Sequence, residues 1–450
     1  MKKKPVRIIR RIVAAEILLI TALFFALHYD AREYTAGSEQ EFLDRICEMT
    51  GNEAVAVGIM DGDEDIYLQH CGITGEQVDE HTLFELGSTT KAFTGLGIMR
   101  LEEAGLIRGS DPVTDYIEWF RPQYKGSDAV ITIDDLMNHS SGIPVWSISR
   151  IPEGGKGEIS LEDTVRTIAN IDLAHAPGQI HEYATINYDV LALIIETVTG
   201  QRYEEYISST VLSDAGMTDS FFRTCDADRG RIFPGVKDAF FLKWRYDAPT
   251  YYGNTAAGYL VSDTSDLVKW MRFVRNNVDF GSFPVTETNN YYAGWNLSPI
   301  TVHHGGNNPN YGTQIIISRH SDLGVFVLTA CDGDAANRIA DGIYGMRAGY
   351  PARIGMCYTS HELLDLIFVV STLLVVYVAL LLPYKHKKAC LGGGVAILAG
   401  IVLVPVISHF SYSFLLVWMP FSFAGLMIVT VAFALLLIIR GAAGCFGMKK

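Results

Sequence analysis

The chain has 450 residues, of which 49% are hydrophobic and 19% charged, so it is neither intrinsically disordered nor a small disulfide-stapled domain. Its net charge of −14 is unevenly spread, because residues 1–29 carry six bases and one acid and residues 384–450 carry six bases and no acid. Residues 30–383 are left with 24 bases against 49 acids, and such an acidic surface repels phosphate backbones. We therefore expect no nucleic-acid partner.

The N-terminal segment starts with bases and continues into an apolar run from Ile12 to Leu27 that Glu16 interrupts. The part from Ile17 to Leu27 has the length of a signal-peptide core, whereas the whole run is barely long enough for a membrane anchor. The residues that follow lack a clean small-x-small cleavage site. Residues 1–29 are therefore predicted to be a signal anchor, with a cleaved signal peptide as the alternative.

Residues 30–360 are predicted to form one domain that begins and ends with a β-hairpin. The first hairpin pairs Ala54–Met60 with Asp65–His70, and the second pairs Thr313–Ser318 with Gly324–Ala330. Helical patterns lie between them at Thr89–Ala104, Leu161–Ile171, Tyr188–Thr199 and Thr264–Val274, the second with Ser160 as its N-cap. This order predicts an α/β (α+β) domain: an antiparallel sheet built from both ends of the domain, with a helical subdomain beside it.

An S-x-x-K motif, Ser88 to Lys91, stands where a β-like run meets Gly87 and a helical pattern. A helix starting at Ser88 would place Lys91 one turn later on the same face. The positive end of the helix dipole and a neighbouring amine both favour loss of the hydroxyl proton, which makes Ser88 a candidate nucleophile. The alternative is a helix cap followed by a surface lysine.

Two later segments carry further candidates. Tyr183 and Thr185 precede the helix that starts near Tyr188, a place where a tyrosine is commonly a packing residue. His304 opens the segment His304-Gly305-Gly306-Asn307-Asn308, in which glycines beside a strand mark a close backbone approach and which by itself is typical of a turn. Taken alone, neither segment establishes a catalytic site.

The sequence gives no support for a metal site or a cofactor. It contains no H-E-x-x-H motif, and the adjacent His303 and His304 lack a ligand partner at a telling distance. Five cysteines fall in the outer domain, an odd number at scattered spacings that favours buried free thiols, with one disulfide as the alternative. They are Cys47, Cys71, Cys225, Cys331 and Cys357.

Residues 361–450 are predicted to form a three-helix transmembrane domain with spans at Leu363–Leu382, Leu391–Ile407 and Leu415–Ile439. Bases stay cytoplasmic, so Lys385 to Lys388 and Arg440 lie inside and the 30–360 domain lies outside a bacterial cell membrane. Gly392, Gly393 and Gly394 permit tight helix contacts within the chain or in a homo-oligomer.

In this order the segments resemble the class C-like branch of the serine β-lactamase and penicillin-binding-protein superfamily over about residues 30–345. Two more segments carry the resemblance: Leu136 to Pro144, similar to L-L-x-H-T-S-G-L-P, and Gly258 to Leu267, similar to G-G-L-x-S-x-x-D-L. The resemblance implies that Ser88 is acylated and that Lys91 and Tyr183 move its proton. It also implies that His304 assists proton transfer and substrate docking.

The resemblance further implies an oxyanion hole from the backbone N–H groups of Ser88 and Asn307, with Gly306 and Asn308 beside the substrate. Two departures stand out, since Thr185 replaces the asparagine of Y-x-N and His304-Gly305-Gly306 replaces K-T-G. Both replaced residues contact the substrate in lactamases, so another amide or ester is the expected substrate.

A class C-like domain followed by three spans is similar to the membrane peptidases that remove an N-acyl-D-asparagine cap from peptide prodrugs, as in colibactin maturation. There the helices support an enzyme that acts on lipophilic acyl peptides. The alternatives are a cell-envelope D-amino-acid peptidase or esterase, a true β-lactamase, and a sensor that Ser88 acylation would switch without turnover.

Overall fold

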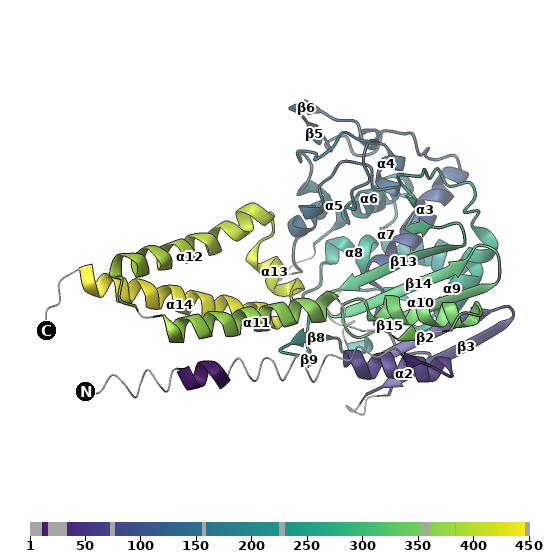
Figure 1. Ribbon diagram of the computed structural model, residues 1–450. Helices are drawn as coiled ribbons and strands as arrows, with labels where there is room; N and C mark the ends of the chain where they lie inside the picture. The colour runs from purple at the N-terminus through teal and green to yellow at the C-terminus, as the bar shows by residue number, and fades with distance from the viewer. Residues whose placement is uncertain are drawn as a thin grey trace. The chain divides into compact units, whose positions relative to one another are not determined.

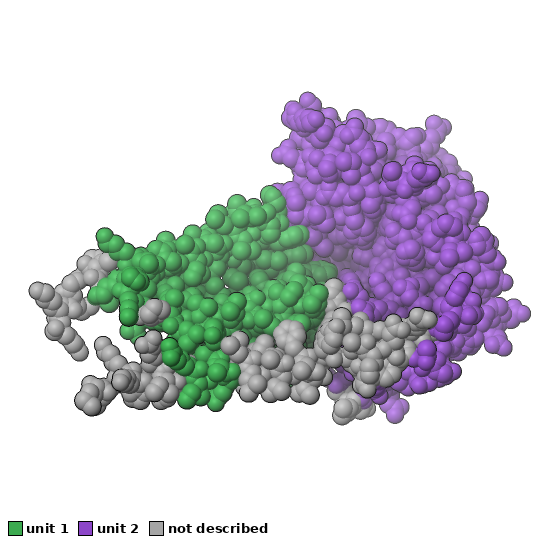
Figure 2. All heavy atoms as spheres, viewed as in Figure 1, with its two compact units in different colours: residues 1–34, 237–244, 355–450 green, residues 35–236, 245–354 purple. Residues whose placement is uncertain are grey.

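The computed structural model describes residues 11–16, 34–72, 77–154, 159–224, 230–351, 353–354, 360–382 and 384–445. It divides the chain into two compact units, which Figure 2 distinguishes by colour. Unit 2 comprises residues 35–236 and 245–354, and unit 1 comprises residues 1–34, 237–244 and 355–450. The predicted N-terminal segment lies largely outside the described residues.

The central sheet of unit 2 has seven antiparallel strands in the order β11-β12-β13-β14-β15-β2-β3. Figure 1 labels its strands β13, β14, β15, β2 and β3. Both predicted hairpins are confirmed, and pairing of β2 with β15 joins the beginning of the domain to its end. The strands are β2 (Ala54–Asp61), β3 (Glu64–Cys71), β11 (Tyr291–Tyr292), β12 (Trp295–Leu297), β13 (Thr301–Asn308), β14 (Tyr311–Ser318) and β15 (Leu323–Thr329).

Helices cover both faces of this sheet because its strands alternate apolar side chains to both sides. Phe326 and Leu328 of β15 belong to the main core with Met271 of α9 (Thr264–Asn277). An added Cβ at Gly58 would lie 2.9 Å from Val268, so β2 and α9 approach closely. Helices α2 (Glu39–Thr50) and α10 (Ala335–Arg347) pack against each other and on the sheet.

The helical subdomain and a second sheet complete unit 2. The second sheet has the order β4-β10-β7, formed by β4 (Phe84–Glu85), β10 (Leu260–Ser262) and β7 (Phe221–Phe222). The helices are α3 (Lys91–Glu103), α4 (Ile133–Met137), α5 (Leu161–Arg166), α6 (Asn187–Thr199), α7 (Tyr203–Ile207) and α8 (Thr255–Gly258). The predicted fold class, an α/β domain with an antiparallel sheet and a helical subdomain, is therefore confirmed.

Several predicted helix boundaries need correction. Helix α3 begins at Lys91 rather than Thr89, because residues Gly87–Thr90 form a separate 3-10 turn. Helix α5 ends at Arg166, although Ser160 caps it as predicted through a capping box with Asp163. The third apolar span is broken at Met419-Pro420, since the proline ring favours a new helix start over continuation.

Among its described residues, unit 1 contains three helices long and apolar enough to cross a membrane. They are His361–Leu381, Lys387–Ser408 and Phe421–Ala443, which lie in α11 (Ser360–Leu381), α12 (Lys387–Ser408) and α14 (Phe421–Cys445). The short helix α13 (Tyr412–Trp418) precedes α14. Gly394 allows α12 and α14 to approach, because an added Cβ would lie 2.6 Å from the carbonyl oxygen of Ala434. This glycine therefore serves a contact within the chain.

Among the cysteines whose side chains are described, Cys47, Cys71, Cys331 and Cys390 are not in disulfide bonds. Cys71 is exposed and the other three are buried, which agrees with the expected free thiols except for the exposure of Cys71. Cys225 and Cys357 lie outside the described residues.

Candidate active site

Ser88 lies on a sharp turn between β4 and α3. Gly87 adopts φ of +55°, which bends the chain directly from the strand into the 3-10 turn Gly87–Thr90. An added Cβ at Gly87 would also lie 2.7 Å from the backbone nitrogen of Asn307, so only glycine fits there. Ser88 is partly exposed whereas both of its neighbours are buried. The turn therefore presents one hydroxyl to solvent at the edge of the core.

Lys91 reaches back to Ser88 from the first residue of α3. Its Nζ lies 3.0 Å from Ser88 Oγ, 2.8 Å from Thr185 Oγ1 and 2.8 Å from the carbonyl oxygen of Ala257. The side chain is fully buried, so the alternative of a helix cap followed by a surface lysine is wrong. Ser88 and Lys91 are in direct hydrogen-bond contact, as nucleophilic catalysis requires.

Burial lowers the pKa of Lys91 to about 7, and the buried carboxylate of Asp189 partly opposes this shift. Asp189 has its own pKa raised by burial, while attraction from Lys91 acts the other way. With its side-chain nitrogen turned towards Asp189, Asn254 donates to both carboxylate oxygens at 2.8 and 3.1 Å. Lys91 is therefore close to half neutral at neutral pH, where an amine can accept a proton.

The hydrogen-bond partners of Lys91 also fit the neutral state. A neutral amine has two N–H donors and one lone pair. The Ala257 carbonyl oxygen can only accept, so one N–H donates to it and the second donates to Thr185 Oγ1. The lone pair is left for the Ser88 O–H at 3.0 Å. This arrangement aims the hydroxyl proton at the amine.

Tyr183 lies beside this pair. Lys91 Nζ is 5.2 Å from the centroid of the Tyr183 ring. The phenol oxygen is buried and makes no hydrogen bond within the described part of the chain. Burial raises the pKa of Tyr183, and the nearby Ser88 hydroxyl only partly opposes this. The phenol is therefore protonated at neutral pH, which suits a proton donor and not the first base.

His304 lies in strand β13, not in a turn, and is buried. Its Nδ1 is in hydrogen-bond contact with the carbonyl oxygen of Gly305, so Nδ1 carries the proton and Nε2 accepts from the Tyr291 hydroxyl at 3.0 Å. Burial, helped by the nearby Lys91 charge, lowers the pKa of His304 to about 3. The ring is consequently neutral and positions Tyr291.

A cluster of rings connects His304 to Tyr183, and sequence reasoning missed most of it. The His139 ring lies 4.2 Å from the Tyr183 ring and 4.7 Å from the Tyr291 ring. His139 Nδ1 accepts from the side-chain nitrogen of Asn187 at 3.0 Å, and burial keeps the pKa of His139 well below its usual value. The segment from Leu136 to Pro144, which contains His139, carries the family resemblance, but its sequence pattern by itself assigns no role to the histidine.

The backbone of β13 packs against the serine turn. An added Cβ at Gly306 would lie 2.2 Å from the carbonyl oxygen of Leu86 and 2.9 Å from the backbone nitrogen of Ser88. Asn307 is exposed, and its side chain, with the nitrogen turned inward, donates to Asp332 at 3.2 Å. The predicted oxyanion donors, the backbone N–H groups of Ser88 and Asn307, are thus brought to adjoining segments.

Asn308 has a structural place in this arrangement. It is buried, and its side-chain nitrogen donates to Glu85 at 2.6 Å and to the carbonyl oxygen of Gly258 at 3.0 Å. Glu85 in turn forms a buried ion pair with Arg223. Both amide protons of Asn308 are therefore used within the protein, which ties the end of β13 to β4 rather than to a substrate.

The comparisons with known proteins agree with this geometry. The Beta-lactamase family matches residues 40–349, which is more than half of the chain. The chain therefore belongs to the β-lactamase family, whose members are generally serine hydrolases. The match covers all the site residues described above.

Curated relatives and solved structures extend the likeness. The chain is 29% identical over 281 residues to Protein flp of Staphylococcus aureus (strain COL), covering 58% of this chain and 55% of that protein. It is 35% identical over 148 residues to the putative penicillin-binding protein PbpX of Bacillus subtilis (strain 168), covering 33% and 35%. The chain thus spans little more than half the length of the first of these relatives and about a third of the second.

Two solved structures share the fold. An octameric penicillin-binding protein homologue from Pyrococcus abyssi matches with a TM-score of 0.61 at 22% identity, covering 74% of this chain and 81% of that one. EstCE1, a hydrolase with promiscuous acyltransferase activity, matches with a TM-score of 0.58 at 17% identity, covering 68% and 98%. At these identities the likeness concerns the fold alone.

Proposed function

We propose that the protein is a membrane-anchored serine hydrolase that works through an acyl-enzyme on Ser88. The observation that carries this proposal is the 3.0 Å contact between Ser88 Oγ and the buried amine of Lys91. The lowered pKa of Lys91, about 7, supplies a base at neutral pH. A partly exposed hydroxyl beside a buried neutral amine is the pairing that nucleophilic catalysis needs.

The proposed reaction has two stages. Ser88 Oγ attacks the substrate carbonyl carbon while its proton passes to Lys91 Nζ, and the backbone N–H groups of Ser88 and Asn307 stabilise the oxyanion. The bond to the leaving group then breaks, and the leaving group takes a proton from the Tyr183 phenol. The Lys91 ammonium gives its proton to the phenol oxygen in return. In the second stage water attacks the acyl carbon and gives up a proton to Lys91 Nζ. The bond between the acyl carbon and Ser88 Oγ then breaks, and Ser88 Oγ takes that proton back as the acid leaves.

The charge of the site bears on the substrate class. Where a penicillin-recognising relative would carry a lysine in K-T-G, this chain has the neutral, buried His304, with a pKa of about 3. Thr185, which replaces the asparagine of Y-x-N, is engaged with Lys91. At the two positions expected to hold a penicillin, the chain therefore has a neutral His304 ring and a Thr185 hydroxyl that is already hydrogen-bonded to Lys91. We infer that the substrate is another amide or an ester.

The substrate we propose is an acyl peptide with an amide next to a D-amino acid, of the N-acyl-D-asparagine type. Three apolar helices in the same chain support it, since they suit a lipophilic acyl group presented at a membrane. The second candidate is a D-amino-acid peptidase or esterase of the cell envelope, which the relatedness to a putative penicillin-binding protein favours.

The proposed membrane anchoring is also supported by a hairpin within residues 236–245. Strands β8 (Val236–Ala239) and β9 (Leu242–Arg245) carry residues 237–244, which group with the apolar helices of unit 1. The Lys237 amine donates to the carbonyl oxygens of Leu416 and Val417 at 2.9 and 2.6 Å. The chain on either side of residues 237–244 groups with unit 2, so the hydrolase domain is tied to unit 1 by more than one segment.

The turn of this hairpin is also held. Phe240 and Phe241 have φ of +52° and +66°, a conformation unfavourable for residues other than glycine. Their backbone nitrogens donate to the two carboxylate oxygens of Asp365 at 3.1 and 2.7 Å, which offsets the strain. Asp365 belongs to α11, the first apolar helix, so its carboxylate fixes the hairpin turn within unit 1.

The test of activity uses the purified full chain in detergent with Ser88→Ala as control. N-acyl-D-Asn, N-acyl-L-Asn and N-acyl-D-Ala peptides are incubated with each, and products are followed by mass spectrometry. Cleavage of the D-Asn peptide by the wild type alone supports the proposal. Preference for the D-Ala peptide, together with covalent labelling of the protein by a fluorescent penicillin, supports the second candidate. Acylation of Ser88 without turnover supports a sensor. Equal cleavage by wild type and Ser88→Ala removes Ser88 from the mechanism.

The proposed topology places the hydrolase domain outside the cytoplasm, because Lys385, Lys387, Lys388 and Arg440 flank the spans on one side. The test is protease accessibility in intact spheroplasts. We expect fragments of the hydrolase domain to be released before the membrane is broken. Complete protection until lysis would contradict this orientation.

A further inference from the structure

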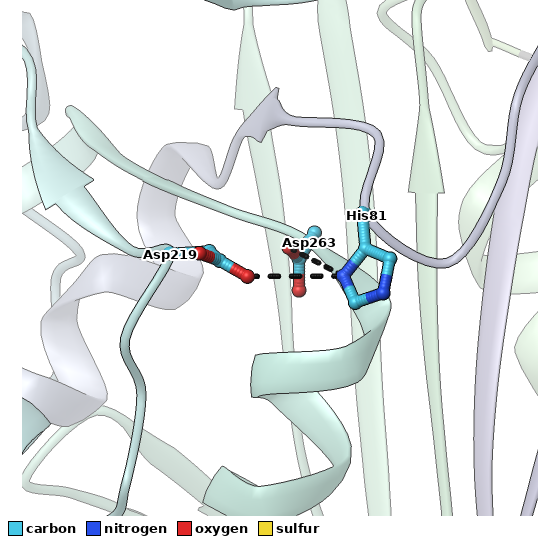
Figure 3. Close-up of side chains that lie close together, drawn as sticks. All are labelled: His81, Asp219 and Asp263. Carbon is cyan, nitrogen blue, oxygen red and sulfur yellow. Dashed lines mark ion pairs between the residues drawn. The ribbon is translucent and has the colours of Figure 1, made fainter.

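Three side chains of unit 2, two of them exposed and one buried, converge in the fold. His81 Nδ1 lies 3.7 Å from Asp219 Oδ2 and 3.8 Å from Asp263 Oδ2 (Figure 3). One ligand atom from each residue lies within 4.8 Å of the others. The three come from the segment before β4, the segment before β7, and the N-cap of α9. The tertiary fold therefore brings together three residues from segments that are far apart in the sequence.

The carboxylate of Asp263 has one oxygen that the described part of the protein does not satisfy. Its Oδ1 caps α9 by accepting from the Asp266 backbone nitrogen at 2.8 Å. The Asp263 side chain is completely buried, and its Oδ2 has no hydrogen-bond partner among the described residues. A buried carboxylate oxygen left without a hydrogen bond is costly.

Neighbouring groups do not satisfy this oxygen. Lys269 is the nearest amine of α9, and it donates to Asp266 at 2.8 Å. The carboxylate of Asp266 also accepts from the backbone nitrogens of Asp219 and Ser220 at 2.8 and 2.9 Å. The Lys269 amine and these backbone N–H groups therefore donate to Asp266. The hydrogen bond to Asp266 also holds the backbone of Asp219 in place. The carboxylate oxygens of Asp219 and Asp263 are left facing the His81 ring.

We propose that His81, Asp219 and Asp263 bind a divalent transition-metal ion of the zinc type. Metal–nitrogen and metal–oxygen bonds of about 2.0–2.2 Å hold neighbouring tetrahedral ligands about 3.3–3.5 Å apart. The separations of 3.7 and 3.8 Å are too long for hydrogen bonds and close to that spacing. An imidazole with two carboxylates suits zinc better than calcium or magnesium, which favour all-oxygen ligands. Water would fill the fourth position.

The position of the site indicates that a bound ion would stabilise the local fold. The Glu80 carbonyl oxygen already accepts from the Ser265 backbone nitrogen at 3.1 Å, so the segment holding His81 lies on the start of α9. Strand β4 follows this segment, pairs with β10 and leads into the Ser88 turn. A bound ion would join the beginning of β4 to the end of β10. It stabilises the strand that supports Ser88 without contacting the reacting atoms.

The experiment measures Zn²⁺ binding by isothermal titration to the untagged full chain, after removal of metal with a chelator. We expect saturable binding of one ion, a rise in the thermal unfolding temperature with Zn²⁺, and no competition by a large excess of Ca²⁺ or Mg²⁺. His81→Ala and Asp219→Asn should each weaken binding by at least about tenfold. Both positions are exposed, so the variants are expected to fold.

The matched control is His70→Ala. His70 lies 2.7 Å from Asp44, which makes another histidine–carboxylate pair on the same domain, and no third metal-ligating side chain joins it among the described residues. This variant should bind Zn²⁺ as the wild type does. Unchanged affinity in His81→Ala, loss of binding in His70→Ala, displacement of Zn²⁺ by Ca²⁺, or no saturable binding would each overturn the proposal. The hydrolase assay is separate, because Ser88→Ala should bind Zn²⁺ like the wild type.

Discussion

Replacing Thr185 by valine tests whether Lys91 is the base. The variant keeps the shape of the side chain and removes the oxygen that lies 2.8 Å from Lys91 Nζ. Because Lys91 must be unprotonated to take the Ser88 proton, activity should rise with pH through its pKa of about 7. The ammonium has three acceptors in the structure, so it loses one of three in the variant.

The size of the effect follows from the difference between two hydrogen bonds. A bond from an ammonium contributes about 1.5–3 kcal/mol and one from a neutral amine about 0.5–1.5 kcal/mol. The ammonium therefore loses about 1–1.5 kcal/mol more than the amine does. One pKa unit corresponds to about 1.4 kcal/mol, so Thr185→Val should lower the pKa of Lys91 by about one unit.

The assay is kcat/KM for hydrolysis of a p-nitrophenyl ester by the full chain from about pH 5 to about pH 9. We expect the rising limb of the profile to shift to lower pH by about one unit in Thr185→Val. Thr185→Ser restores the oxygen and should return the limb to the wild-type position. A limb that stays in place or moves to higher pH in Thr185→Val, or one that moves equally in Thr185→Ser, would refute the assignment of Lys91 as the base.

Three further substitutions test the packing around the site and the hairpin. Gly306→Ala should lower kcat/KM by about 100-fold, because its Cβ would lie 2.2 Å from the Leu86 carbonyl oxygen and displace β13 from the oxyanion position. Asn308→Ala should lower the free energy of unfolding by about 2–3 kcal/mol in denaturant melts, because Glu85 loses a buried hydrogen bond. Lys237→Met should lower the thermal unfolding temperature in detergent, because two carbonyl oxygens of α13 lose their donor.

Each of these variants has a matched control. Gly345→Ala adds a Cβ with no atom within 4 Å and should leave activity unchanged. Asn277→Ala removes an exposed amide, for which a change within about 0.5 kcal/mol is expected. Lys125→Met removes an exposed amine and should leave the unfolding temperature close to that of the wild type. Equal effects in a variant and its control would show that the named contact is not responsible.

Much of the fold could be predicted because periodicity and turn chemistry are local. The apolar runs Ala54–Met60 and Gly324–Ala330, each beside a short polar turn, specified two hairpins, and both strands are buried along almost their whole length. The helix after Ser160 began as its N-cap residue indicated, but it ended at Arg166, earlier than the pattern predicted. Helix ends depend on packing with the rest of the domain, which a local pattern does not contain.

Of the site, the sequence by itself supplied the residue types and their order: a serine, a lysine three residues later, a tyrosine, and a histidine followed by two glycines. Apolar length likewise supplied the three helices that could span a membrane. These properties depend on composition and spacing along the chain, so they can be read without coordinates.

The tertiary structure decided what these groups can do. Burial of Lys91 lowered its pKa, burial of Tyr183 raised its pKa, and burial made His304 a neutral ring that positions Tyr291. It also placed His81 beside two aspartates distant in the chain. Protonation and coordination depend on solvent access and on neighbours far along the chain, and only the packed fold determines both.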